Sequence, residues 1–191
     1  MDGLSYLPGF EPQAAPADDH DGDGDEWYTP FEVLRAIRSL THDGRIAVDP
    51  CYAPRSLTDP HHRIDIRRGG DGLTDEWPGH GLAFVNPPYS DVGPWLARCQ
   101  HESRKRQVIM LIPMRPETAA WWSHVWRGGG FVVVQRGRLR FVGPTGERHG
   151  NGMITTCFVT WHEGLATQLA QALTLEGVEA IAIGPLPLCP W

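Results

Sequence analysis

The chain has 191 residues, of which 41% are hydrophobic and 21% are charged, fractions typical of a globular protein with one hydrophobic core. No apolar run approaches the roughly 18–20 residues of a membrane-spanning helix, and the N-terminus is too acidic for a secretory signal, which excludes membrane and secreted proteins. The net charge of −6 arises in residues 1–27, which hold eight acidic side chains and no Lys or Arg, so the rest of the chain has a net charge of +2 and is compatible with a nucleic-acid partner.

In chain order, residues 1–24 combine Pro, Gly, Ala and Asp with few large apolar side chains. This composition predicts a disordered acidic tail, followed by a single domain over residues 25–191. A helix is expected from Phe31 to Leu40, with Thr29 as its N-cap and Pro30 at its first position.

Short apolar runs then alternate with helical patterns. Strands are predicted at 46–48, 63–66, 82–85, 108–112, 131–135, 139–142, 154–161 and 180–183, and further helices at 94–103, 117–126 and 165–175. Such alternation predicts an α/β fold with a mostly parallel sheet flanked by helices. The four cysteines lie far apart without a C-x-x-C pair, so we expect reduced thiols and no metal site.

The strongest chemical signal is the tetrad Asn86-Pro87-Pro88-Tyr89, which directly follows the apolar strand at 82–85. Ligands in open α/β sheets lie beyond the carboxyl ends of strands. The two prolines stiffen the backbone and remove two N–H donors, which leaves carbonyl oxygens that can only accept hydrogen bonds. Asn86 adds a side-chain acceptor and Tyr89 adds an aromatic face. The tetrad is therefore suited to bind a planar amino group, although a rigid loop that only caps the strand is the structural alternative.

Such a receptor can also activate the amino group. An exocyclic amine that is conjugated with its ring is a poor nucleophile. If the tetrad accepts hydrogen bonds from both N–H protons, the nitrogen moves toward a tetrahedral geometry and its lone pair becomes available for attack on an electrophilic methyl group. This chemistry requires no metal ion.

The tetrad and its surroundings resemble the small phage and prophage DNA N6-adenine methyltransferases, a family also called Dam-like. The matching motifs, spread over about residues 25–161, are Asp25-Glu26-Trp27-Tyr28-Thr29-Pro30, Val48-Asp49-Pro50, Asp71-Gly72-Leu73 with Trp77, Phe84 to Ser90, Ile112-Pro113-Met114-Arg115, and Arg136-Gly137-Arg138-Leu139-Arg140-Phe141.

This resemblance implies a Rossmann-like fold, S-adenosylmethionine as the methyl donor, and methyl transfer to an adenine flipped out of double-stranded DNA. It also implies roles for single residues. Asn86, Pro87, Pro88 and Tyr89 would grip the adenine; Trp27, Thr29, Pro30, Asp49, Pro50 and Asp71 would bind the donor; and Arg115, Arg136, Arg138 and Arg140 would contact DNA. A cytoplasmic location in a bacterium or a phage-infected host cell follows from the same resemblance.

Two departures from the common methyltransferase pattern leave alternatives open. The sequence after Asp49-Pro50 has no Gly-x-Gly loop, and no clear acidic residue ends a second strand to bind the donor's ribose, for which Asp65 is a candidate. An enzyme that methylates RNA or a protein glutamine, or a catalytically inactive DNA-binding module, are therefore competing interpretations. Further phosphate contacts are expected from Arg67-Arg68 and Arg104-Lys105-Arg106, near the same edge of the sheet as Asn86. No pattern in the sequence specifies an oligomeric state.

Overall fold

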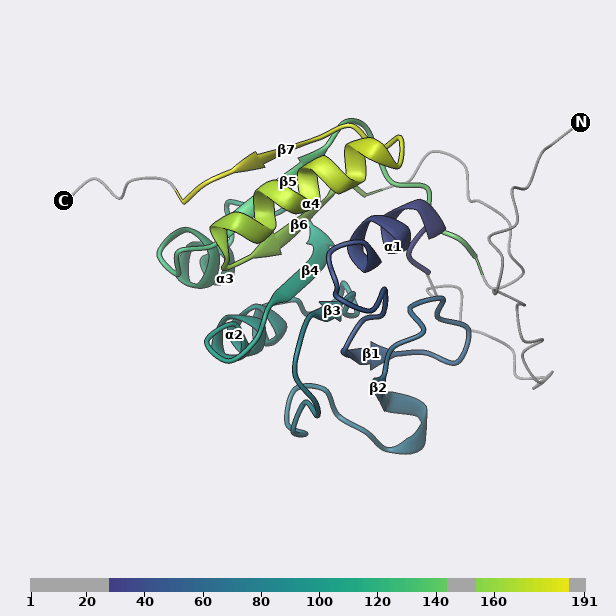
Figure 1. The fold of residues 1–191 in the computed structure, drawn as a ribbon. Helices are drawn as coiled ribbons and strands as arrows, with labels where there is room; N and C mark the ends of the chain where they lie inside the picture. The colour runs from purple at the N-terminus through teal and green to yellow at the C-terminus, as the bar shows by residue number, and fades with distance from the viewer. Residues whose placement is uncertain (1–27, 144–153, 186–191) are drawn as a thin grey trace, which may run out of the picture.

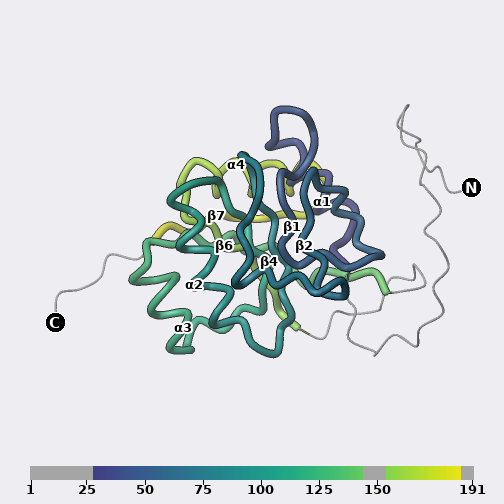
Figure 2. The backbone as a smooth tube through the Cα atoms, turned by 90° about the horizontal axis from the view of Figure 1, so that it is seen from below, coloured from purple at the N-terminus to yellow at the C-terminus, as the bar shows by residue number. Residues whose placement is uncertain are grey.

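The computed structural model describes residues 28–143 and 154–185, which form a seven-stranded sheet with helices on both faces (Figures 1 and 2). The order of the strands across the sheet is β2-β1-β3-β4-β6-β5-β7. The elements are α1 (Phe31–Arg38), β1 (Val48–Tyr52), β2 (His62–Asp65), the short 3-10 helix η1 (Ile66–Arg68), β3 (Ala83–Val85), α2 (Gly93–Glu102), β4 (Val108–Pro113), α3 (Ala119–Trp121), the π-helix η2 (Trp122–Trp126), β5 (Phe131–Gln135), β6 (Thr156–Thr160), α4 (Glu163–Leu175) and β7 (Ala180–Ile183).

The sheet has two halves with different strand directions. In the first half, β2, β1, β3 and β4 pair in parallel. In the second half, β6 pairs antiparallel with both β4 and β5, and β7 pairs antiparallel with β5. The expected α/β class is confirmed, whereas parallel pairing is confined to the first half. The reason is that β6 inserts between β4 and β5, which run in the same direction, and it runs opposite to both.

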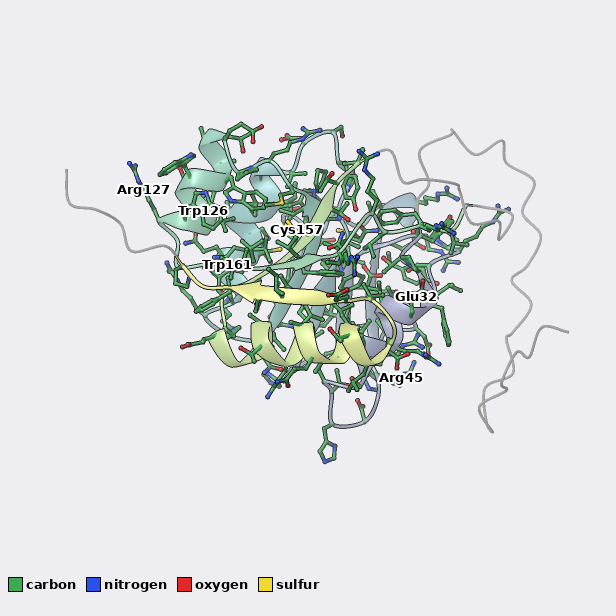
Figure 3. All side chains as sticks on the ribbon, turned by 90° about the horizontal axis from the view of Figure 1, so that it is seen from above. Glu32, Arg45, Trp126, Arg127, Cys157 and Trp161 are labelled. Atoms are coloured by element: carbon green, nitrogen blue, oxygen red, sulfur yellow. The ribbon has the colours of Figure 1, made fainter. Side chains whose placement is uncertain are left out.

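Each face of the sheet carries its own hydrophobic core. Buried side chains of α1 and α4, including Leu34, Ile37 and Leu169, pack on one face. Side chains of α2, α3 and η2, including Trp95 and Trp121, pack on the other face. The apolar residues of α1 recur at helical spacing, which lets this helix bury one side. Cys157 of β6 lies between the two helical layers (Figure 3) and is a free buried thiol, as the cysteine spacing predicts.

Four local predictions differ from the structure. The strand expected at 46–48 is β1 at Val48–Tyr52, so Asp49 and Pro50 lie within the strand and do not follow it. Residues 139–142 form no strand, because β5 already pairs with β6 and β7 on its two sides and Gly137 turns the chain away with a φ of 78°. Pro30 rather than Thr29 takes the N-cap position of α1, with a φ of −59° and a ψ of 147°. The predicted helix at 117–126 begins at Ala119 and continues from Trp122 as a π-helix.

The carboxyl ends of β1, β2, β3 and β4 lie at one edge of the sheet, which we call the carboxyl edge. Asn86 follows β3 at this edge, Arg67 follows β2, and Arg115 follows β4. Residues 104–106 instead precede β4 and therefore lie at the opposite edge, which corrects the expectation that they flank Asn86. The parallel register of β3 and β4 requires this separation, since Ala83 pairs with Val108. Within the described residues, no helix is long and apolar enough to cross a membrane, and no cluster of side chains is suited to hold a metal ion.

Candidate active site

Three segments that are far apart in the sequence meet beside Asn86. The side-chain amide of Asn86 donates from Nδ2 to Oγ1 of Thr29 over 3.4 Å. The ring of Tyr89 contacts that of Phe141 at a centroid distance of 6.3 Å and an interplanar angle of 79°. Tyr28 and Val142 exchange two backbone hydrogen bonds of 3.0 Å. The tetrad, the segment before α1 and the Arg136–Phe141 segment, each identified from its own motif, therefore form one site.

The amide of Asn86 is held at both ends. Its Nδ2 donates to Thr29, and its Oδ1 accepts a hydrogen bond from the hydroxyl of Tyr89 over 3.1 Å. Thr29 is only 4% exposed, so its hydroxyl has little freedom to exchange this partner for water. An amide oxygen has two lone pairs and can accept from more than one donor. The structure thus presents a fixed acceptor at the carboxyl edge before any substrate binds.

Thr29 fills a different role from the helix cap that its position predicts. Because Pro30 takes the N-cap position, the Thr29 hydroxyl makes no cap hydrogen bond and is available to Asn86. The sequence pattern gives no sign of this pairing, because the two residues are 57 positions apart. Only the docking of α1 against the sheet brings them together.

Tyr89 is a neutral hydrogen-bond donor. Burial raises the pKa of its phenol well above the ordinary value, so the hydroxyl keeps its proton and can donate to Asn86. Phe141 packs against its ring and restricts its orientation. An aromatic ring held in this way suits stacking with a nucleic-acid base.

Asp49 is buried within β1, and only 3% of the residue is exposed. Its Oδ1 accepts from the backbone N–H of Cys51 over 2.9 Å, and its Oδ2 accepts from the Thr58 hydroxyl over 2.7 Å. Burial raises the pKa of the Asp49 carboxyl to about 6, against the lowering effect of these hydrogen bonds. Thr58, itself buried and contacted by the Ser56 hydroxyl at 2.9 Å, is a functional candidate that sequence motifs did not reveal.

Asp71 lies in an exposed turn close to β1. Its Oδ1 accepts from the Leu73 backbone N–H and its Oδ2 from the Thr74 hydroxyl, both over 2.9 Å, and these bonds lower its pKa. The neighbouring Gly72 packs so tightly that a Cβ atom there would collide with the carbonyl oxygen of Pro50. The predicted donor residues Asp49, Pro50 and Asp71 are therefore close together, although both carboxylate oxygens of Asp71 already support the turn.

Two further residues that the sequence predicts to bind the methyl donor are Trp27 and Asp65. Trp27 lies outside the described residues. Asp65, the candidate acid for the donor's ribose, accepts from the Arg67 backbone N–H over 3.0 Å and caps η1, and Arg68 lies 3.5 Å from its other oxygen. The carboxylate of Asp65 thus stabilises the start of η1 at the end of β2.

The predicted DNA-contacting arginines all have exposed side chains. Arg138 and Arg140 alternate with the buried Leu139 and Phe141, so the expected alternation is present although the strand is not. Arg136 forms an ion pair with Glu179 at 2.9 Å, which raises the pKa of its guanidinium. Arg115 and Arg140 form no ion pair with another residue in the described part of the chain.

The carboxyl edge thus brings together a fixed amide acceptor and a neutral aromatic ring, two groups that suit the binding of a planar amino group. A protein-family model described as DNA N-6-adenine-methyltransferase (Dam) matches residues 17–169. The chain therefore belongs to the Dam family of DNA N6-adenine methyltransferases, whose methyl donor is S-adenosylmethionine. No individual curated protein matches the chain.

Proposed function

We propose that the carboxyl edge is the active site at which this enzyme methylates an adenine flipped out of double-stranded DNA, at a specific sequence. The observation that carries this proposal is the hydrogen-bonded chain from Thr29 through Asn86 to Tyr89. It ties the predicted donor segment to the predicted adenine receptor. We also propose that the enzyme acts in the cytoplasm of a bacterium or a phage-infected host cell, where its DNA substrate is found.

The residues around β1 fit S-adenosylmethionine. The oxygens of Asp49 accept from the Cys51 N–H and the Thr58 hydroxyl, and the Ser56 hydroxyl also stabilises the carboxylate. A carboxylate oxygen can accept more than one hydrogen bond, which suits the ammonium group of the donor's methionine end. Burial disfavours the ionised form of Asp49 and so raises its pKa, whereas a cationic group of a ligand beside the carboxylate would favour the ionised form. Thr29, Pro30, Pro50 and Asp71 would complete this side of the site. When bound, the donor supplies an electrophilic methyl group.

Asn86 and Pro87 supply the acceptors for the adenine amino group. Oδ1 of Asn86 would accept one N–H proton and a carbonyl oxygen of the tetrad the other, which frees the nitrogen lone pair for attack. The nitrogen loses one proton as it gains the methyl group. Neither the Asn86 amide nor the neutral Tyr89 phenol is a base, so this proton passes to water. Tyr89 would stack on the adenine and hold it in line with the donor.

The base must leave the duplex to reach the tetrad. Arg115, Arg138 and Arg140 are exposed along the same edge and would bind the flanking phosphates. Arg136 would exchange its exposed ion pair with Glu179 for a phosphate, a change that costs little because water screens exposed ion pairs.

The test is methyl transfer from radiolabelled S-adenosylmethionine to unmethylated double-stranded DNA, followed by digestion to nucleosides. We expect the label in N6-methyladenosine with the wild-type protein and none with Asn86→Ala, which should retain donor binding in calorimetry. Label in RNA or a protein acceptor alone would contradict the proposed substrate. A protein that binds DNA but neither binds nor uses the donor would be an inactive binding module.

A further inference from the structure

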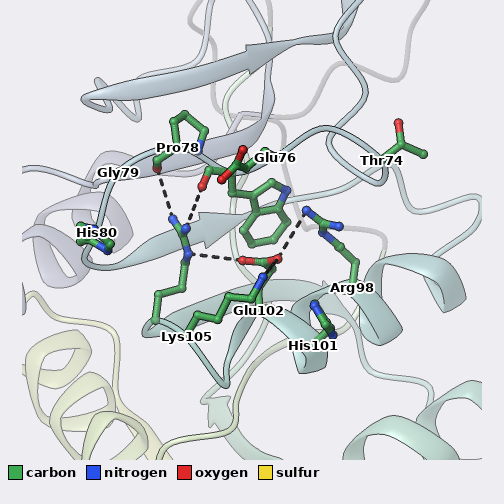
Figure 4. Close-up of a pocket in the computed structure, with 11 residues that line it drawn as sticks. Thr74, Glu76, Pro78, Gly79, His80, Arg98, His101, Glu102 and Lys105 are labelled. Atoms are coloured by element: carbon green, nitrogen blue, oxygen red, sulfur yellow. Dashed lines mark hydrogen bonds and ion pairs between the residues drawn. The ribbon is translucent and has the colours of Figure 1, made fainter.

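A cavity of about 680 Å³ lies between residues 74–80 and the C-terminal half of α2 (Figure 4). Glu102, which lines it, is only 3% exposed, a rare environment for a carboxylate. Three cations surround this carboxylate: Arg98 Nη2 lies 3.4 Å from Oε1, Lys105 Nζ 3.6 Å from Oε1 and Arg106 Nε 3.4 Å from Oε2. Glu102 is therefore the common counter-charge of three basic side chains.

Two of these cations hold the backbone of the loop that covers the cavity. Arg106 donates from Nη2 to the Trp77 carbonyl over 2.7 Å and from Nη1 to the Pro78 carbonyl over 3.2 Å. Arg98 donates to the Asp75 carbonyl over 2.8 Å, and its guanidinium lies 5.4 Å from the centroid of the Trp77 ring. Because like charges repel, the two guanidiniums need the Glu102 carboxylate between them to hold the loop together.

The same loop leads to the donor side of the site. The indole N–H of Trp77 donates to the carbonyl of Gly72 over 2.7 Å, and the ring is buried. Gly72 packs directly against the Pro50 carbonyl and the Trp95 ring, where no side chain would fit. Asp71, one residue earlier, caps the turn at Leu73 and Thr74. Hydrogen bonds and close packing therefore connect Glu102 with Pro50 of β1 and with Asp71.

We infer that Glu102 is a positioning residue for the methyl-donor site. Its charge fixes loop 71–78 on α2 and so fixes the place where Gly72, the neighbour of Asp71, packs against Pro50. Glu102 itself lies at the end of α2 away from Asn86 and touches no reacting group. A buried ion pair is weak evidence for stability as such, which favours a role in geometry. This inference rests on the proposed function, in which Asp71 and Pro50 contact S-adenosylmethionine.

The first test is Glu102→Gln, which keeps the shape of the side chain and removes its charge. We expect the Kd for S-adenosylmethionine in calorimetry, and the KM for it in the methylation assay, to rise about 3- to 30-fold. The kcat at saturating donor and the KM for DNA should stay within about twofold, since adenine and its acceptors are untouched. Glu76→Gln is the matched control, because Glu76 lines the same cavity but is exposed.

The second test is Trp77→Phe, which keeps an aromatic side chain of smaller size and removes the N–H that binds Gly72. It should raise the KM for the donor in the same way, and the double variant should lose less than the product of the two single effects, because both act through one path. Variants that fold and bind S-adenosylmethionine like Glu76→Gln would overturn the inference while the proposed function stands. A wild-type protein that fails to bind the donor would instead overturn the proposed function. If Glu102→Gln does not fold, Trp77→Phe decides alone.

Discussion

Asp49 allows a test that separates stability from donor binding. Burial raises the pKa of its carboxyl in the folded protein to about 6, from an ordinary value of 3.8. The folded state therefore binds the proton more tightly than the unfolded chain, and stability falls as the pH rises from about 4 to above 6. A difference of about two pKa units corresponds to a destabilisation of about 3 kcal/mol at pH 8, since each unit is worth about 1.4 kcal/mol.

Asp49→Asn removes the charge and keeps the size of the side chain. The amide oxygen can still accept from Cys51, and the amide N–H can donate to the Thr58 hydroxyl, which then donates to Ser56. The variant should therefore be more stable than wild type at pH 8, by up to about 3 kcal/mol. The advantage should be smaller by about 1.4 kcal/mol at pH 5, where the wild-type carboxyl is largely protonated. Its affinity for S-adenosylmethionine should fall, because the carboxylate partner of the donor's ammonium is lost.

Urea unfolding at pH 5 and pH 8, with m-values compared, measures this difference. Asp59→Asn is the matched control: Asp59 lies in the same connection between β1 and β2 but is exposed, with a weak ion pair to Arg45 at 3.0 Å, so its effect should be the same at both pH values. The assignment of a buried, costly charge would be refuted in two cases. Either the Asp49→Asn variant is less stable than wild type at pH 8, or its free energy of unfolding differs from that of wild type by the same amount at both pH values.

Three further outcomes test the assembled site. Thr29→Val removes the partner of the Asn86 amide and should lower kcat about 2- to 10-fold, the effect of one hydrogen bond, with unchanged thermal stability as the check on folding. Tyr89→Phe should lose less than tenfold in kcat, whereas Tyr89→Ala should also raise the KM for DNA by the loss of about 1–3 kcal/mol of base stacking; equal effects would exclude stacking. Arg140→Ala should reduce the slope of log K for DNA against log salt by about 1, and Arg104→Ala at the opposite edge should leave it unchanged.

Local patterns in the sequence carry much of the fold. The apolar runs at 108–112 and 131–135 are strands in the structure, because β-branched and aliphatic residues there favour a buried strand. The run at 180–183 also forms a strand, β7, although Ile181 is 63% exposed there. The direction of the second half of the sheet was not predictable in this way. The direction of β6 relative to β4 depends on the end of the sheet at which the chain enters it. The apolar residues of β6 would be equally buried in a parallel and in an antiparallel arrangement.

The sequence by itself predicted the family of this protein, which the family match confirms, from a series of motifs centred on a tetrad with acceptors and an aromatic ring after a buried strand. Only the tertiary structure decided which groups hold that tetrad. Thr29 reaches Asn86 and Phe141 reaches Tyr89 because helix and loop packing close long gaps in the sequence, and Thr58 reaches Asp49 through the fold of the loop after β1. A motif records the residue types that the reaction needs, whereas the partners that fix their orientation depend on contacts that no local pattern encodes.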